Sequence, residues 1–115
     1  MIEQLSLANF ADWCSGAAPK QPLVLDVREP WEVQTASVKP DGFTLLCIPM
    51  QSIPARMAEL KQFGADHPVG CLCHHGIRSQ QVARYLMGQG FTNVVNLQGG
   101  IEAWALEIDT GCPQY

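Results

Sequence analysis

The residue types best suited to nucleophilic chemistry gather in one segment, Val69–Ser79. Its pattern predicts a strand that ends at Cys73, a short polar loop, and then a helix whose N-terminus is capped by Ser79. Gly76 permits a positive φ, so the loop can curl until successive N–H groups point inward and bind an anion. The cation of Arg78 and the positive end of the helix dipole add to the same field. Because such a field favours the thiolate, we expect Cys73 to be a reactive nucleophile.

Other interpretations of this segment stay open at the level of sequence. Cys73 could be a buried structural thiol, because free cysteines are among the most buried residues. Cys71 and Cys73, with the two histidines that follow, could form a metal cluster, although the two well-separated pairs of a structural zinc site are missing. A disulfide between Cys71 and Cys73 would be strained, because alternate residues of a strand lie near the largest separation that a disulfide accepts. We therefore expect no metal ion and no cofactor.

The composition indicates one globular domain over residues 1–115. A hydrophobic fraction of 47% is ordinary for such a domain, and a net charge of −4 provides no basic surface for nucleic acid. No apolar run approaches the ~20 residues of a membrane span, and the first residues lack the pattern of a signal peptide. An odd number of cysteines, 5, argues against a disulfide framework. We expect a cytoplasmic protein without nucleic-acid or membrane partners, and the oligomeric state stays open.

Short apolar strands alternate with helical patterns along the chain. After an opening extended segment, strands are predicted at residues 23–27, 44–48, 69–73 and 94–97, and helices follow each of them. This alternation predicts an α/β fold with a mainly parallel central sheet flanked by helices on both faces. The loop after Cys73 would then leave the carboxyl edge of a central strand. We also expect Tyr85 on the buried face of its helix, and Cys112 as an exposed or loosely held thiol without a role in an irregular tail.

Asp26 is the one acidic residue of the predicted strand 23–27, and it lies near the carboxyl end of that strand. One interpretation is a carboxylate that caps a turn. The other places Asp26 beside the Cys73 loop, because sites in parallel sheets gather at the carboxyl ends of strands. Pro30, a few residues later, suits the first turn of a short helix.

Four segments in this order make the chain resemble the single-domain rhodanese family of sulfurtransferases. They are Leu25–Glu32, Ile48–Met50, Cys73–Ser79 and Asn96–Trp104, within a match of about residues 23–106. The resemblance implies a rhodanese-like α/β fold and a catalytic cysteine, Cys73, that carries a sulfane sulfur as a persulfide. It implies that the anionic substrate is bound by the loop residues His74, His75, Gly76, Ile77, Arg78 and Ser79. The supporting residues that it implies are Asp26 and Arg28.

Two departures from the family pattern concern substrate binding. His74 stands where the family often has arginine, so one positive charge of the loop depends on pH. Residues 35–42 replace the family's usual Gly-His-Ile-Pro-Gly-Ala stretch and could shape the rim of the pocket. His74 and His75 are then either polar residues that line the pocket or donors to a bound anion.

The predicted function is transfer of a sulfane sulfur from a small anionic donor such as thiosulfate, through Cys73, to a thiol, a protein cysteine or cyanide. A phosphatase or arsenate reductase of the same fold would need five residues between cysteine and arginine, whereas this chain has four. A non-enzymatic interaction domain fits less well, because Cys73 and Arg78 are both present. A persulfide carrier that acts with a dedicated protein partner is compatible with the same residues.

Overall fold

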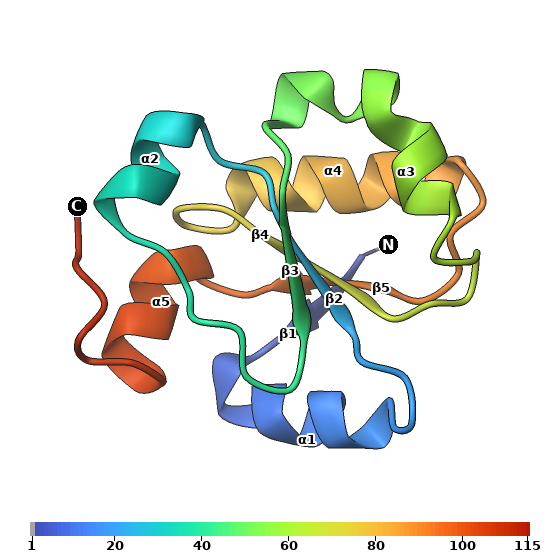
Figure 1. Cartoon of the computed structure of the whole chain (residues 1–115). Coiled ribbons are helices and arrows are strands. Elements are labelled where there is room, and N and C mark those ends of the chain that lie inside the picture. The colour runs from blue at the N-terminus through green and yellow to red at the C-terminus, as the bar shows by residue number, and fades with distance from the viewer. Residues whose placement is uncertain (1) are drawn as a thin grey trace.

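The computed structural model describes residues 2–115 and contains a five-stranded parallel sheet (Figure 1). Its strands are β1 (Glu3–Leu5), β2 (Leu23–Asp26), β3 (Thr44–Cys47), β4 (Val69–Leu72) and β5 (Val94–Leu97). They lie side by side in the order β1-β5-β4-β2-β3, and every neighbouring pair is parallel. The strand that leads to Cys73 is therefore the middle strand of the sheet, and the predicted fold class is confirmed.

Helices cover both faces of the sheet (Figure 1). One face carries the 3-10 turns η2 (Met50–Ser52) and η3 (Pro54–Arg56) and the helices α3 (Met57–Lys61) and α4 (Ile77–Gly88). The other carries η1 (Leu7–Asn9), α1 (Phe10–Gly16) and α5 (Gly100–Glu107). The short helix α2 (Pro30–Thr35) follows the carboxyl end of β2, and the proline predicted in its first turn is its first residue.

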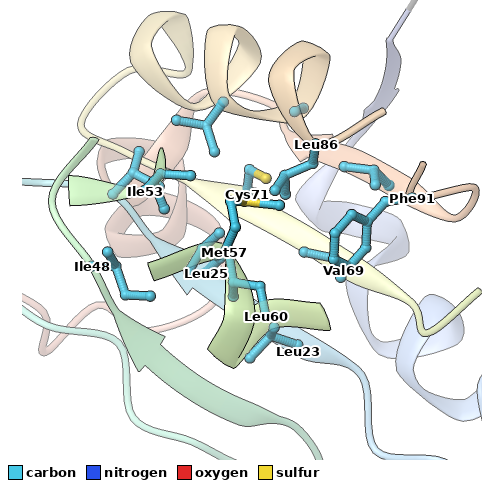
Figure 2. Packing of buried hydrophobic residues seen from close by; sticks show 14 of the residues in the cluster. Leu23, Leu25, Ile48, Ile53, Met57, Leu60, Val69, Cys71, Leu86 and Phe91 are labelled. Atoms are coloured by element: carbon cyan, nitrogen blue, oxygen red, sulfur yellow. The ribbon is translucent and has the colours of Figure 1, made fainter. Parts of the chain in front are cut away.

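Each face of the sheet has its own apolar core, because alternate residues of a strand point to opposite faces. Leu23 and Leu25 of β2 face α3 and α4, where they join Leu60 and Leu86 (Figure 2). Val24 points the other way, into a second cluster with residues of α1 and α5. All four residues of β2 and of β4 are buried, which explains why these strands are continuous apolar runs rather than alternating ones.

Three sequence predictions are wrong in detail. Tyr85 is 37% exposed, because it lies on the side of α4 away from the sheet, whereas Val82, Ala83 and Leu86 face it. Cys112 is buried, because the tail folds back toward the segment after α2, where the Cys112 thiol lies 3.8 Å from the Ser37 carbonyl oxygen. The helix predicted to follow the strand at residues 44–48 is broken into η2, η3 and α3, with Pro54 opening the second turn. No helix within residues 2–115 is long and apolar enough to cross a membrane.

Candidate active site

The Cys73 thiol lies where β4 gives way to α4, and its side chain is buried. The backbone N–H of Gly76 donates to Cys73 Sγ at 3.1 Å, and Ser79 Oγ lies 3.3 Å from the same sulfur. Gly76 has φ +104°, the conformation that turns the loop back and points this N–H at the sulfur. The sulfur therefore lies at the N-terminus of a 12-residue helix, where the helix dipole favours negative charge.

The role predicted for Ser79 as the N-terminal cap of α4 is wrong. Gly76 occupies the cap position, and the helix begins at Ile77, so Ser79 is in the first turn. The left-handed conformation of Gly76 closes the loop earlier than the polar pattern indicates. Ser79 is fully buried, and its hydroxyl group lies against Cys73 and Asn96 instead of the helix backbone.

The N-terminus of α5 fixes the other side of the loop. The N–H of Ile101 donates to the Cys73 carbonyl at 2.8 Å, and the N–H of Glu102 donates to the His74 carbonyl at 3.2 Å. A Cβ atom on Gly100, which has φ +62°, would overlap both carbonyl oxygens. Gly99 and Gly100 form the glycine pair of the segment Asn96–Trp104, and the structure shows that this close approach requires glycine at position 100.

Arg78 forms a bidentate ion pair with Glu32 of α2. Its two terminal nitrogens donate to the two carboxylate oxygens at 2.6 and 2.8 Å. Tyr115 also donates to this carboxylate, at 2.7 Å. The bonds from Arg78, opposed by burial and aided by the Tyr115 hydroxyl, lower the pKa of Glu32 to about 2. Glu32 lies at the end of the segment Leu25–Glu32, but nothing in its local sequence pattern distinguishes it from other acids on helix surfaces.

Asp26 and Arg28 form a second, fully buried ion pair at 2.6 Å. The backbone N–H of Arg28 also donates to Asp26 Oδ1, so Asp26 caps a turn, as one of the two interpretations stated. Arg28 extends from this pair to the carbonyl groups of Glu32 and Ala36 and to the Tyr115 hydroxyl, at 2.8–3.2 Å. Both residues therefore hold α2, which in turn holds Arg78.

The two histidines of the loop belong to a stack of rings. His74 lies between His75, at 3.9 Å, and Tyr115, at 4.0 Å between ring centroids. Glu102 of α5 holds His75 through a 3.2 Å contact. Tyr115 also packs edge-on against Trp31 of α2, so the tail lies against both α2 and the loop. Ile77 points outward and is 73% exposed.

The other cysteine thiols are poorly suited to act as nucleophiles. Burial is the main cause that raises the pKa of Cys14, Cys47, Cys71 and Cys112. The effect is largest at Cys71, whose pKa rises to about 12 in the core beneath α4 (Figure 2). All five thiols are free, and within residues 2–115 no group of three or more histidine, cysteine or acidic side chains is placed to hold a metal ion.

The sequence model of the rhodanese-like domain matches residues 10–107. The chain belongs to this family. A sulfurtransferase of Allochromatium vinosum is 43% identical over 83 residues, which cover 72% of this chain and 71% of the relative. The thiosulfate sulfurtransferase GlpE of Vibrio cholerae is 39% identical over 85 residues, 74% of either chain. A solved rhodanese-like domain protein of Staphylococcus aureus superposes with a TM-score of 0.72, at 25% identity over 99% of both chains.

Membership of the rhodanese-like family agrees with the way the site is assembled. Three of the four segments that suggested the resemblance meet in space, because β2, β4 and β5 are adjacent in the sheet and their carboxyl ends lie at one edge. Cys73 follows β4, the Asp26–Arg28 pair follows β2, and the glycine pair follows β5.

Proposed function

We propose that this rhodanese-like protein is a sulfurtransferase that carries a sulfane sulfur as a persulfide on Cys73. The observation that supports the proposal most strongly is the environment of Cys73 Sγ, which lies at the N-terminus of α4 with the Gly76 N–H at 3.1 Å. That environment stabilises negative charge on the sulfur both before the reaction and as charge returns to it. The named relatives support the same activity.

The reaction consists of two displacements at sulfur. In the first, the Cys73 thiolate attacks the outer sulfur of thiosulfate, the sulfur–sulfur bond of the donor breaks, and sulfite leaves with the bonding electrons. In the second, a thiolate or cyanide attacks the outer sulfur of the persulfide, and the Cys73 thiolate is restored. Because the first product leaves before the acceptor reacts, ping-pong kinetics are expected.

The loop residues take distinct parts in this proposal. The Gly76 N–H and the Ser79 hydroxyl contact the reacting sulfur, while Arg78, held in its ion pair with Glu32, is the permanent cation of the loop segment. The stacked His74 and His75 form the rim at which the sulfonate end of the donor is bound. Ile77, which points into solvent, offers its backbone N–H and an apolar contact for the acceptor.

The physiological acceptor is a thiol, either a small molecule or a cysteine of a protein. Sulfur transfer to a dedicated protein partner uses the same chemistry at Cys73, so the persulfide carrier is a special case of the proposal. The cytoplasmic location and the single domain over residues 1–115 stay predictions from the sequence.

Intact mass after incubation with thiosulfate tests the proposal. Wild type should gain the mass of one sulfur, which dithiothreitol or cyanide removes, and Cys73→Ser should gain none. Cys14→Ser and Cys47→Ser are matched controls that keep the adduct. An adduct that survives Cys73→Ser would disprove the assignment of the nucleophile. Hydrolysis of an aryl phosphate by wild type, abolished in Cys73→Ser, would favour a phosphatase instead.

A further inference from the structure

The side chain of Asn96 is a buried amide on β5, beneath the N-terminus of α4. It is 1% exposed, and its residue pairs with Cys71 in the register of β4 and β5. Its Nδ2 donates to the Gly76 carbonyl at 3.0 Å and to Gln4 Oε1 at 2.9 Å. Its Oδ1 accepts from the Ser79 hydroxyl at 2.6 Å. Every polar atom of this amide is bonded, which is the normal state of a buried polar group and fixes its position.

The two residues that Asn96 holds, one in the loop and one in the first turn of α4, are the two that contact the sulfur of Cys73. The Gly76 carbonyl accepts from Asn96, and the Gly76 N–H donates to Cys73 Sγ. Ser79 lies between Asn96 Oδ1 and the same sulfur, at 2.6 and 3.3 Å. A small movement of the Asn96 amide would therefore displace both hydrogen-bonding groups around the nucleophile.

The protons in this network can be assigned from the chemistry of its atoms. A carbonyl oxygen only accepts, so the Gly76 carbonyl must face the Asn96 NH₂ group, and the Asn96 oxygen must face Ser79. Ser79 Oγ carries one proton and has two acceptors within reach, Asn96 Oδ1 at 2.6 Å and Cys73 Sγ at 3.3 Å, so the hydroxyl can donate to either of them.

We infer that Asn96 is a positioning residue for sulfur transfer. Its hydrogen-bond partners are Gly76, Ser79 and Gln4 rather than the sulfur, and it acts by orienting the Gly76 N–H and the Ser79 hydroxyl toward Cys73 Sγ. This inference rests on the proposed sulfurtransferase function. Because Arg78 and the outer loop bind the donor, a change at Asn96 should slow sulfur loading and leave donor binding nearly unchanged.

Loading of Cys73 with thiosulfate in a single turnover is measured by intact mass at several thiosulfate concentrations. The limiting rate reports the speed of sulfur loading, and the half-saturating concentration reports donor binding. Asn96→Ala should lower the limiting rate about tenfold or more, the size expected for losing a hydrogen bond to a charged group. Asn96→Asp keeps the shape and the acceptor for Ser79 but loses the donor to the Gly76 carbonyl, and it should also load slowly. Asn93→Ala, at the other end of β5, should match wild type.

Variants of Ser79 distinguish a positioning role of Asn96 from a purely structural one. Only a positioning role predicts that the effects of Asn96 and Ser79 on the loading rate depend on each other. Ser79→Ala should load slowly, and Ser79→Thr, which retains a hydroxyl, should restore most of the rate. The double variant Asn96→Ala/Ser79→Ala should lose less of the loading rate than the product of the two single fold-losses. The two losses do not multiply because both residues act on the same contact with the sulfur. Folding of each variant is checked by thermal unfolding, and Asn96→Asp remains informative if Asn96→Ala does not fold.

Three results would overturn the inference. They are wild-type loading by both Asn96 variants, losses that multiply in the double variant, and a raised half-saturating concentration at an unchanged limiting rate. The rate of Cys73 alkylation by iodoacetamide at fixed pH depends on the same hydrogen bonds of Asn96, Ser79 and Gly76, and it is measured without any sulfur donor. If wild type takes no sulfur but alkylation shows the coupling of Asn96 and Ser79, the proposed function fails and the network stands. If loading is normal and neither assay responds to Asn96, only this inference fails.

Discussion

Replacing Glu32 by Gln tests whether the loop after Cys73 depends on an ion pair with α2. The carboxylate accepts two bonds from Arg78 and one each from the Tyr115 hydroxyl and the Glu29 N–H, at 2.6–3.0 Å. Gln keeps the size of the side chain but removes the charge. Hydrogen bonds to charged groups contribute about 1.5–3 kcal/mol each. Water replaces part of the loss, because the Arg78 side chain is 32% exposed.

The expected loss of stability for Glu32→Gln is about 2 kcal/mol at neutral pH, or roughly 8 °C in Tm. The loss should depend on pH, because Arg78 lowers the pKa of Glu32 from 4.5 to about 2 in the folded protein. A depressed carboxylate pKa stabilises the fold above the unfolded value and loses that contribution as pH falls through the folded value. Wild type and Glu32→Gln should therefore converge below about pH 4, with about half of the difference gone near pH 3.

Urea unfolding at several pH values measures this difference, and Glu59→Gln is the matched control. Glu59 also accepts two bonds from an arginine, Arg56, but on the exposed surface, so its replacement should change stability little. Equal losses for the two variants, or a Glu32→Gln loss that stays constant down to pH 2.5, would refute the reasoning about the buried pair.

Three further predictions concern the loop and the groups that hold it. Gly100→Ala should cost at least about 2 kcal/mol and lower sulfur loading, because a Cβ at φ +62° overlaps two loop carbonyls, whereas Gly16→Ala meets nothing within 4 Å and should cost nothing; thermal unfolding compares them. Tyr115→Phe should lower stability by about 1 kcal/mol through its lost bonds to Glu32 and Arg28, and Tyr115→Ala should lower it further by removing the stack on His74. Arg78→Lys should slow sulfur loading, because an ammonium cannot reproduce the two parallel bonds to Glu32.

The sequence by itself determined the fold class and the place of the candidate nucleophile, the Cys73 thiol. Apolar runs bounded by turn residues predict parallel strands, because strand propensity and hydrophobic periodicity depend only on residues that are close in the sequence. The segment from Cys73 to Arg78 likewise holds, within six residues, the thiol, a glycine able to turn the loop, and a cation. Its position at the carboxyl edge of the middle strand followed from the alternation of strands and helices, and the structure confirms it.

Only the tertiary structure decided which side chains surround that thiol. Glu32 meets Arg78 across 46 residues and Tyr115 across 83, and Asn96 meets Ser79 across 17. The local pattern around Glu32 and Asn96 is that of an ordinary surface acid and an ordinary strand residue. Their partners depend on how β2, β4 and β5 pack side by side and on the exact approach of α5 to the loop, which neither propensity nor spacing encodes. Ser79 shows the same limit, because its hydroxyl bonds to a neighbouring strand instead of the helix end that its residue type predicts.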